Sequence, residues 1–404
     1  MRAISNQRAL RGNAVVKAVI SRAVSSLITS PGLRQARRAA ADLRRRMSGA
    51  RAVVHYFHQD ADPYSRLAAQ ALPQLADHYD IRIEAHRVSP PAPGAAPDPE
   101  RLAAWAARDA CRLAVAHGFD PEAPADDILE AFQASTDLAA GDALLERLGH
   151  YQGGMFHFDG EWFWGLDRLH YLERRLRASN LAREGAETAL VAPPRDVMLA
   201  PAPPPRRTPV LHMFPSFRSP YTYIALPRAQ ALAQHYGAEL RIRFVLPMVM
   251  RGLPVPRAKS RYITLDTKRE AERLDMPFGR IVDPVGLGVE RGLAVLHHAI
   301  PAGRGCDFAL SFLQGAFAEG IDATTDAGLG RMVENAGLST EIMTTALADE
   351  SWRDVAEANR QEMLAAGLWG VPSFRVDDGE AVWGQDRLWA VEEDLRVAAA
   401  GEIT

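Results

Sequence analysis

The feature that most constrains this chain of 404 residues is an internal repeat, because the fold must accommodate the same succession of elements twice. Residues 53–65 (VVHYFHQDADPYS) resemble residues 210–222 (VLHMFPSFRSPYT). In both copies an alanine-rich segment follows, then a His-Tyr pair, then a run in which apolar and charged residues alternate. Each copy is therefore predicted to contain a strand, a helix and a second strand, close to the minimum length for a parallel crossover.

A second pair of similar segments lies farther along the chain, at residues 159–169 (DGEWFWGLDRL) and 378–388 (DGEAVWGQDRL). An Asp-Gly pair between apolar-rich runs is a strong signal for a β-hairpin, and a helical pattern follows each hairpin. The alanine-rich, helical region between the two parts is about 62 residues longer in the second copy. This order of elements is that of a thioredoxin fold with a helical lid. The sequence therefore predicts an α/β protein with two tandem thioredoxin-like domains, each with an α-helical insertion that is larger in the second.

Composition separates these domains from an arm and a linker. Residues 191–209 contain seven prolines, which is typical of a semi-rigid linker. The predicted parts are a basic helical arm (1–50), a degenerate thioredoxin-like domain (51–187), a Pro-rich linker (188–208) and a thioredoxin-like domain with a cofactor site (209–401).

The arm is strongly basic. Residues 1–51 contain twelve Lys or Arg and one acid, a balance of +11, so the rest of this chain of net charge −3 carries −14. Nucleic-acid binding by the body is therefore not expected. The arm fits a helix that packs its Val, Ile and Leu side on the body, a helix that contacts an anionic membrane surface, or a segment for targeting or nucleic-acid binding. No apolar run is long enough to span a membrane.

Ser219 precedes Pro220 at the start of the first helix in the second copy, and this pair predicts an N-cap followed by proline at the first helical position. In a thioredoxin fold this helix terminus holds a reactive sulfur, because the helix dipole favours a thiolate. The two cysteines, Cys111 and Cys306, both lie elsewhere in the chain and form no CxxC pair, so thiol–disulfide exchange is not expected. A serine hydroxyl at this point could instead act only as a cap, or could donate a hydrogen bond to the thiolate of a bound cofactor. Cysteine usage favours a reducing, cytoplasmic location.

Four motifs together make residues 209–399 resemble the 2-hydroxychromene-2-carboxylate isomerases and kappa-class glutathione transferases of the DsbA-like superfamily. They are residues 217–223 (FRSPYTY), 256–262 (PRAKSRY), 370–374 (GVPSF) and 383–388 (WGQDRL). The whole chain also resembles tandem two-copy members of that superfamily. The resemblance implies glutathione as cofactor, with Ser219 as the catalytic residue that activates its thiol.

The same resemblance implies the cofactor contacts. The matching residues are Lys259, Val371, Pro372, Gln385 and Asp386. In the family the Val-Pro peptide is cis and the backbone before the proline pairs with the cysteinyl backbone, whereas the Gln-Asp pair holds the γ-glutamyl end. Lys259 also fits an ordinary surface lysine, and Asp386 also fits a helix cap or a partner of Arg387. The segment 251–254 (RGLP) lacks the asparagine that is common in the family, which leaves the substrate open.

The first copy departs from this pattern. Asp62 stands where Ser219 stands, and a carboxylate beside a thiolate would raise the thiol's pKa. No proline matches Pro372 near residues 153–156. We therefore expect a structural partner domain. Its run of His55, His58, Asp60 and Asp62 contains metal-ligand types but no third fixed ligand, and we predict no metal there.

The sequence-based hypothesis is a glutathione-dependent isomerase or transferase, similar to 2-hydroxychromene-2-carboxylate isomerase, for a small hydrophobic or aromatic substrate. The alternative is a non-catalytic binding or scaffold protein with the same fold. The expected partners are that substrate and, through the arm, a membrane surface to which a cytoplasmic protein would be peripheral; no nucleic acid is expected. The oligomeric state stays open.

Overall fold

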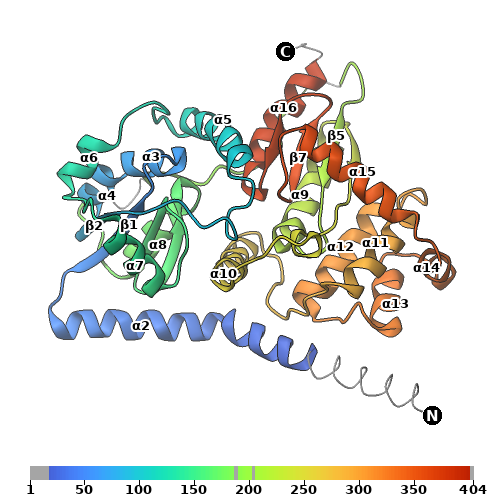
Figure 1. Ribbon diagram of the computed structural model, residues 1–404, viewed down its shortest axis with the longest axis horizontal. Helices are drawn as coiled ribbons and strands as arrows, with labels where there is room; N and C mark the ends of the chain where they lie inside the picture. Colours follow the sequence, from blue (N-terminus) through green and yellow to red (C-terminus); the bar gives the residue numbers. More distant parts are fainter. Residues whose placement is uncertain (1–17, 186–189, 203–204, 401–404) are drawn as a thin grey trace. The chain divides into compact units, whose positions relative to one another are not determined.

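The computed structural model describes residues 18–185, 190–202 and 205–400 and contains two compact units. The amino-terminal unit comprises Arg34–Arg195 and Pro254–Tyr262. The carboxy-terminal unit comprises Asp196–Leu253 and Ile263–Thr404 together with the residues before Arg34. Each unit contains one four-stranded sheet with helices around it (Figure 1).

The sheet of the amino-terminal unit has the strand order β2-β1-β3-β4, in which β1 and β2 are parallel and the other neighbours antiparallel. Its strands are β1 (Ala52–His58), β2 (Ile81–Arg87), β3 (Met155–Phe158) and β4 (Glu161–Trp164). The accompanying helices are α2 (Pro31–Ser48), α3 (Pro63–Gln70), α4 (Leu72–His78), α5 (Pro99–His117), α6 (Asp126–Ala131), α7 (Leu138–Leu148) and α8 (Gly165–Ala178).

The sheet of the carboxy-terminal unit has the order β6-β5-β7-β8 with the same strand directions. Its strands are β5 (Val210–Phe214), β6 (Glu239–Ile242), β7 (Ser373–Val376) and β8 (Ala381–Trp383). Its long helices are α9 (Pro220–His235), α11 (Leu287–Ala299), α12 (Gly305–Gln314), α13 (Asp326–Asn335), α14 (Thr340–Leu347), α15 (Trp352–Ala365) and α16 (Leu388–Ala400), and α10 (Arg257–Arg273) contributes residues to both units. Short turns of helix are η1 (Met248–Arg251), η2 (Gly315–Glu319) and η3 (Gln385–Arg387).

The predicted succession of strand–helix–strand and strand–strand–helix is present in both units, and the helical insertion is longer in the carboxy-terminal one. Local signals start the helix after each first strand. Asp62 and Ser219 have extended backbones and accept hydrogen bonds from amides of the first helical turn, and a proline follows each of them.

The two predicted hairpins differ in their turns. Asp159 and Gly160 alone join β3 to β4 and have φ angles of 48° and 86°, as a tight hairpin turn of mirror-image type requires. In the other hairpin Asp377 takes the left-handed conformation, and residues 377–380 form a four-residue loop. The reason is that the Asp377 carboxylate accepts a hydrogen bond from the Val210 amide at 2.9 Å, which ends β7 one residue before the Asp-Gly pair.

The loop before α9 is held by the core of the carboxy-terminal unit. The Phe217 ring is fully buried and stacks on Phe312 of α12, with 4.2 Å between ring centroids. A Cβ atom at Gly292 of α11 would lie 2.4 Å from the Phe312 ring and 2.8 Å from Phe217. This close packing of the insertion helices against Phe217 fixes the backbone that leads into Ser219.

The helix over residues 18–28 packs with the opposite side from the one we expected. Its buried side is formed by small residues such as Ala18 and Ser25, and the Ser25 hydroxyl accepts a hydrogen bond from the Ile281 amide at 2.9 Å. Its exposed large apolar residues are Val19, Ile20, Val24, Leu27 and Ile28. The expectation failed because small hydroxyl side chains reach the backbone around residues 279–281, which larger side chains could not do. The sequence predicts a helical arm over residues 1–50, of which residues 1–17 lie outside the described part of the chain.

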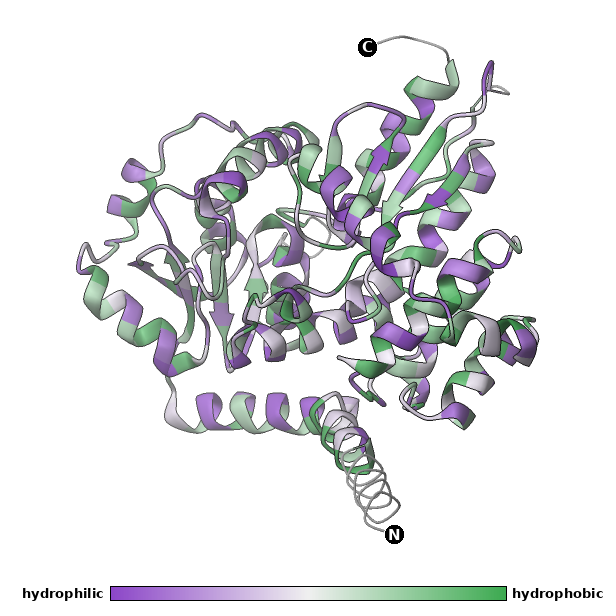
Figure 2. Cartoon of the chain, turned by 45° about the vertical axis from the view of Figure 1, so that its right-hand side comes forward, coloured by the Kyte–Doolittle hydropathy of each residue, from purple (hydrophilic) through white to green (hydrophobic). Residues whose placement is uncertain are grey.

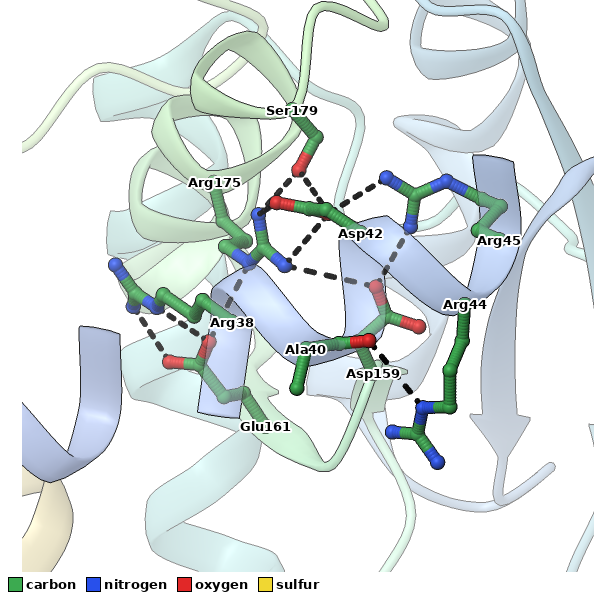
Figure 3. A network of polar contacts seen from close by, with 9 residues as sticks. All are labelled: Arg38, Ala40, Asp42, Arg44, Arg45, Asp159, Glu161, Arg175 and Ser179. Atoms are coloured by element: carbon green, nitrogen blue, oxygen red, sulfur yellow. Dashed lines mark hydrogen bonds and ion pairs between the residues drawn. The ribbon is translucent and has the colours of Figure 1, made fainter. Parts of the chain in front are cut away.

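The following helix, α2, alternates hydrophilic and hydrophobic residues along its length (Figure 2). Two arginines of α2 form ion pairs: Arg38 binds both oxygens of Glu161 at 2.7 and 2.6 Å, and Arg45 binds Asp159 at 2.7 Å (Figure 3). Among the described residues, no helix is both long and apolar enough to cross a membrane.

Candidate functional site

Ser219 caps α9, as predicted. Its side chain is 9% exposed, and its Oγ accepts a hydrogen bond from the Thr222 amide at 3.2 Å. The same oxygen lies 3.5 Å from the backbone carbonyl oxygen of Val371. The hydroxyl therefore stands at the positive end of a 16-residue helix, where backbone amides favour an anion.

The loop that contains Val371 and Pro372 lies against this helix start. The Val371–Pro372 peptide bond is cis, as the family resemblance implied, and Val371 lies beside Ser219 although 152 positions separate the two residues in the chain. Two hydrogen bonds hold the loop: the Gly384 amide donates to Pro372 O at 2.9 Å, and the Ser373 hydroxyl donates to Gly370 O at 2.7 Å. The structure thus brings Ser219, Val371 and Pro372 together.

Gln385 lies along α9, farther from its start. Its side chain is 1% exposed; its Oε1 accepts a hydrogen bond from Arg228 at 2.8 Å, and its Nε2 donates one to Glu270 at 3.0 Å. The whole amide is therefore engaged within the protein. Asp386 is partly exposed, and a Cβ atom at Gly384 would lie 2.4 Å from its Oδ1, so the carboxylate is close to the loop that holds Pro372.

Lys259 groups with the amino-terminal unit, whereas Ser219 belongs to the carboxy-terminal one. Its Nζ donates a hydrogen bond to the backbone oxygen of Ala95 at 2.7 Å, and burial lowers its pKa. The structure thus does not bring Lys259 into one group with Ser219.

Sequence reasoning missed the polar residues that flank Ser219. Arg218 binds the Asp283 carboxylate through two nitrogens at 2.8–3.1 Å. The Tyr221 hydroxyl donates to Asp266 at 2.7 Å, and this fully buried carboxylate also accepts a hydrogen bond from Arg269 at 2.9 Å. The i, i+3 spacing of Asp266 and Arg269 signals an ion pair. Nothing in the sequence indicates that Tyr221 joins it.

The amino-terminal unit carries different residues at the corresponding points. Asp62 accepts hydrogen bonds from both the amide (2.9 Å) and the hydroxyl (2.7 Å) of Ser65, and burial raises its pKa. Gly154 O accepts a hydrogen bond from the Gly165 amide at 2.8 Å, the counterpart of the bond between Pro372 and Gly384. A Cβ atom at Gly153 would lie 2.6 Å from Cβ of Gln59, so the space beside this loop is filled.

Neither cysteine lies at the start of α3 or α9. Cys111 is exposed on α5, and Cys306 lies on α12, where burial and the nearby Asp307 raise its pKa to about 11. Nor does the run of metal-ligand types near β1 converge. His55 and His58 project from opposite faces of the strand, and His58 is 2% exposed with its Nδ1 3.0 Å from the Tyr56 hydroxyl.

Residues 210–396, from β5 into α16, match the family model of the DSBA-like thioredoxin domain. The carboxy-terminal unit is therefore built on a DsbA-like thioredoxin domain, and Ser219 and Pro372 lie inside it. No curated protein matches the chain.

Solved structures similar to this chain include a 2-hydroxychromene-2-carboxylate isomerase (20% identity, TM-score 0.40), of which the match covers 100%, against 48% of this chain. A probable DsbA oxidoreductase from Streptomyces coelicolor is 22% identical with a TM-score of 0.38, and the match covers 92% of it and 48% of this chain. The cytosolic disulfide reductase DsbM from Pseudomonas aeruginosa is 18% identical with a TM-score of 0.36, and the match covers 98% of it and 48% of this chain.

Proposed function

We propose that this protein is a glutathione-dependent isomerase or transferase for a small hydrophobic or aromatic substrate, similar to 2-hydroxychromene-2-carboxylate isomerase. The observation that carries the proposal is the Ser219 hydroxyl at the start of α9, 3.5 Å from the carbonyl of Val371. A hydroxyl at this terminus suits a thiol that comes from a cofactor, because no cysteine of the chain lies at the start of α3 or α9.

Glutathione, when bound, would supply a thiol that adds reversibly to an unsaturated carbon of the substrate. The chain's own contribution is to hold that thiol as a thiolate. The Ser219 hydroxyl would turn from Val371 O toward the sulfur while still accepting the hydrogen bond from Thr222, and the dipole of α9 would add to the stabilisation. The backbone of Val371, beside Ser219, would pair with the cysteinyl backbone.

The other residues implied as glutathione contacts, Asp386, Gln385 and Lys259, differ in whether they could touch the cofactor. Asp386 is partly exposed and anionic, which suits the ammonium of a γ-glutamyl group. Gln385 would act indirectly, by linking Arg228 of α9 to Glu270 of α10. Lys259 is engaged with Ala95 and is not needed for the proposal.

The test compares Ser219→Ala with Asp62→Ala, the equivalent cap in the other unit. The wild type should be retained on immobilised glutathione and should isomerise a chromene carboxylate. Ser219→Ala should stay folded, because losing a cap costs about 0.5–2 kcal/mol, but should raise the pKa of the bound thiol toward the free value of ~8.5 and slow turnover. Thiolate absorbance against pH measures the first effect.

Asp62→Ala should lose similar stability and leave both the thiol pKa and the turnover unchanged. Equal effects of the two substitutions would reduce Ser219 to a cap. A folded wild type that does not bind glutathione would favour the alternative, a non-catalytic binding or scaffold protein.

We also propose that the two units descend from one duplicated domain, with a degenerate copy at residues 51–187, a linker at 188–208 and the cofactor-binding copy at 209–401. The equal strand orders and the matching hydrogen bonds at Gly154 and Pro372 support this proposal. The amino-terminal copy would serve as a structural partner.

For the arm we propose peripheral contact with an anionic membrane on the cytoplasmic side. The supporting observation is the exposed apolar side of residues 18–28, followed in sequence by the arginines of α2. Val24→Glu combined with Leu27→Glu should abolish sedimentation with anionic vesicles. Val115→Glu, at a still more exposed apolar residue on α5, should not, and equal sedimentation of both variants would contradict the proposal.

A further inference from the structure

One face of the amino-terminal sheet carries histidines that the site described above does not use. The Tyr56 hydroxyl contacts Ser65 of α3, so its neighbours His55 and Phe57 project from the other face of β1. On this face His55 lies directly opposite Glu84 of β2 and His157 of β3. His86, two residues after Glu84, projects from the same face.

Three side chains of this face bring ligand atoms together. Nδ1 of His55 lies 3.1 Å from Nε2 of His86 and 3.3 Å from Oε2 of Glu84, and all three atoms are within 4.8 Å of one another. Ligands about 2.0–2.1 Å from a tetrahedral Zn²⁺ are separated by about 3.3 Å. The two separations from His55 Nδ1 therefore already match the spacing that one ion requires, and the third is no longer than 4.8 Å.

The residues around His55, Glu84 and His86 suit a cation, although two arginines, Arg82 and Arg147, lie near enough to act on His55. Arg82 binds Oε1 of Glu84, which leaves Oε2 directed at His55 and orients the carboxylate as an outer-shell partner does. Arg147, on α7, is exposed to solvent, which screens its charge.

Exposure and neighbours define the rest of the site. The side chains of His55 and Glu84 are 22% and 32% exposed, so an ion can enter from solvent. His157 lies beside His55 with 6.0 Å between ring centroids. A hydrogen-bonded cluster without an ion is the competing explanation of the same contacts.

We propose that His55, Glu84 and His86 form a binding site for a divalent transition-metal ion of the Zn²⁺ type. Two imidazole nitrogens and one carboxylate oxygen are a donor set that such ions accept, with water completing the coordination. The proton between the two imidazoles moves to the outer nitrogen of one ring, so both histidines bind as neutral ligands. This site is separate from the proposed glutathione site and does not depend on it.

The test uses the full-length protein, without a histidine tag and after dialysis against a chelator. Calorimetry with Zn²⁺ should give one ion per chain, and Co²⁺ should give the visible absorption of an ion with nitrogen ligands. His55→Ala should weaken Zn²⁺ binding by more than the ~10–100-fold that loss of an outer-shell partner costs.

Glu84→Gln is the second variant, because it preserves side-chain size and the hydrogen bonds of a cluster without an ion while removing the charge; it should also weaken Zn²⁺ binding. His298→Ala is the matched control, since His298 also contacts a carboxylate, Asp349 at 2.8 Å, and it should bind Zn²⁺ as the wild type does. Folded wild type that takes up no Zn²⁺, or Zn²⁺ uptake that both His55→Ala and Glu84→Gln retain, would overturn the proposal.

Discussion

Gly370, the residue before Val371, illustrates how the absence of a side chain shapes the candidate glutathione site. A Cβ atom at Gly370 would lie 2.0 Å from Cζ2 and 2.1 Å from Cε2 of the Trp383 indole. Trp383 belongs to β8, where it pairs with Ser373, and its ring also packs on Trp369 with 4.9 Å between centroids. The indole thus occupies the position that any larger residue would need.

We predict that Gly370→Ala lowers the free energy of unfolding by about 1–3 kcal/mol, because the indole or the loop must move. Gly330 on α13 is the control, since a Cβ atom there would meet nothing within 4 Å. Gly330→Ala should be neutral or stabilising by up to about 1 kcal/mol, as expected for alanine in a helix. Urea denaturation measures both, and equal stabilities of the two variants would contradict the packing argument.

At the scale of the element, α2 is attached to its unit mainly by charged groups. The guanidinium of Arg175, on α8, is 1% exposed and lies 3.1 Å from Asp42, 3.6 Å from Asp159 and 3.6 Å from Glu161 (Figure 3). Asp42 is the only one of these acids on α2. Burial opposes its ionisation, but hydrogen bonds from Arg175, Arg45 and Ser179 outweigh burial and lower its pKa.

We predict that Asp42→Asn destabilises the protein by about 1.5–3 kcal/mol, the usual worth of hydrogen bonds to a charged group, and makes α2 more sensitive to trypsin. Arg44 is also on α2, but its Nε donates a hydrogen bond to Ala40 O at 3.4 Å on the exposed side. Arg44→Ala should change stability by no more than about 0.5 kcal/mol. If Asp42→Asn were as stable and as resistant as Arg44→Ala, the charged contacts would not be what holds α2.

At the scale of the whole molecule, buried histidines make the amino-terminal unit sensitive to acid. Burial lowers the pKa of His150 to about 3 and the pKa values of His58 and His157 to about 4. In the unfolded chain each would titrate near ~6.5, so between about pH 6.5 and pH 4 the unfolded state binds more protons. Stability therefore is full above pH 6.5 and decreases as the pH falls through this window.

We predict that replacing His150 with phenylalanine removes one of these proton-uptake sites. The pH dependence of the unfolding free energy in this window should decrease by about 1.4 kcal/mol per pH unit, the value for one proton. Phenylalanine can retain the packing on Trp162, whose ring centroid lies 4.7 Å from that of His150. Hydrogen exchange at several pH values, resolved by unit, measures the effect; an unchanged slope in the amino-terminal unit would contradict it.

Sequence reasoning succeeded where a signal acts over a few residues. Both helix caps follow from an Asp-Pro or Ser-Pro pair, and the tight turn at Asp159 and Gly160 follows from its dipeptide. Sequence reasoning was less successful where a hydrogen bond to a residue far away in the chain determines the local structure. The second hairpin turn differs because Asp377 binds the Val210 amide, and residues 18–28 pack by their small side because Ser25 binds Ile281.

The sequence by itself therefore determined the order of strands and helices in each unit, the starts of α3 and α9, and the residue types at those starts. Only the tertiary structure decided which distant residues meet. Ser219 faces Val371, Lys259 binds Ala95, and His55 meets Glu84 and His86. The physical reason is that caps and turns depend on contacts within about four residues, whereas these meetings depend on which strands and helices become neighbours and in what register.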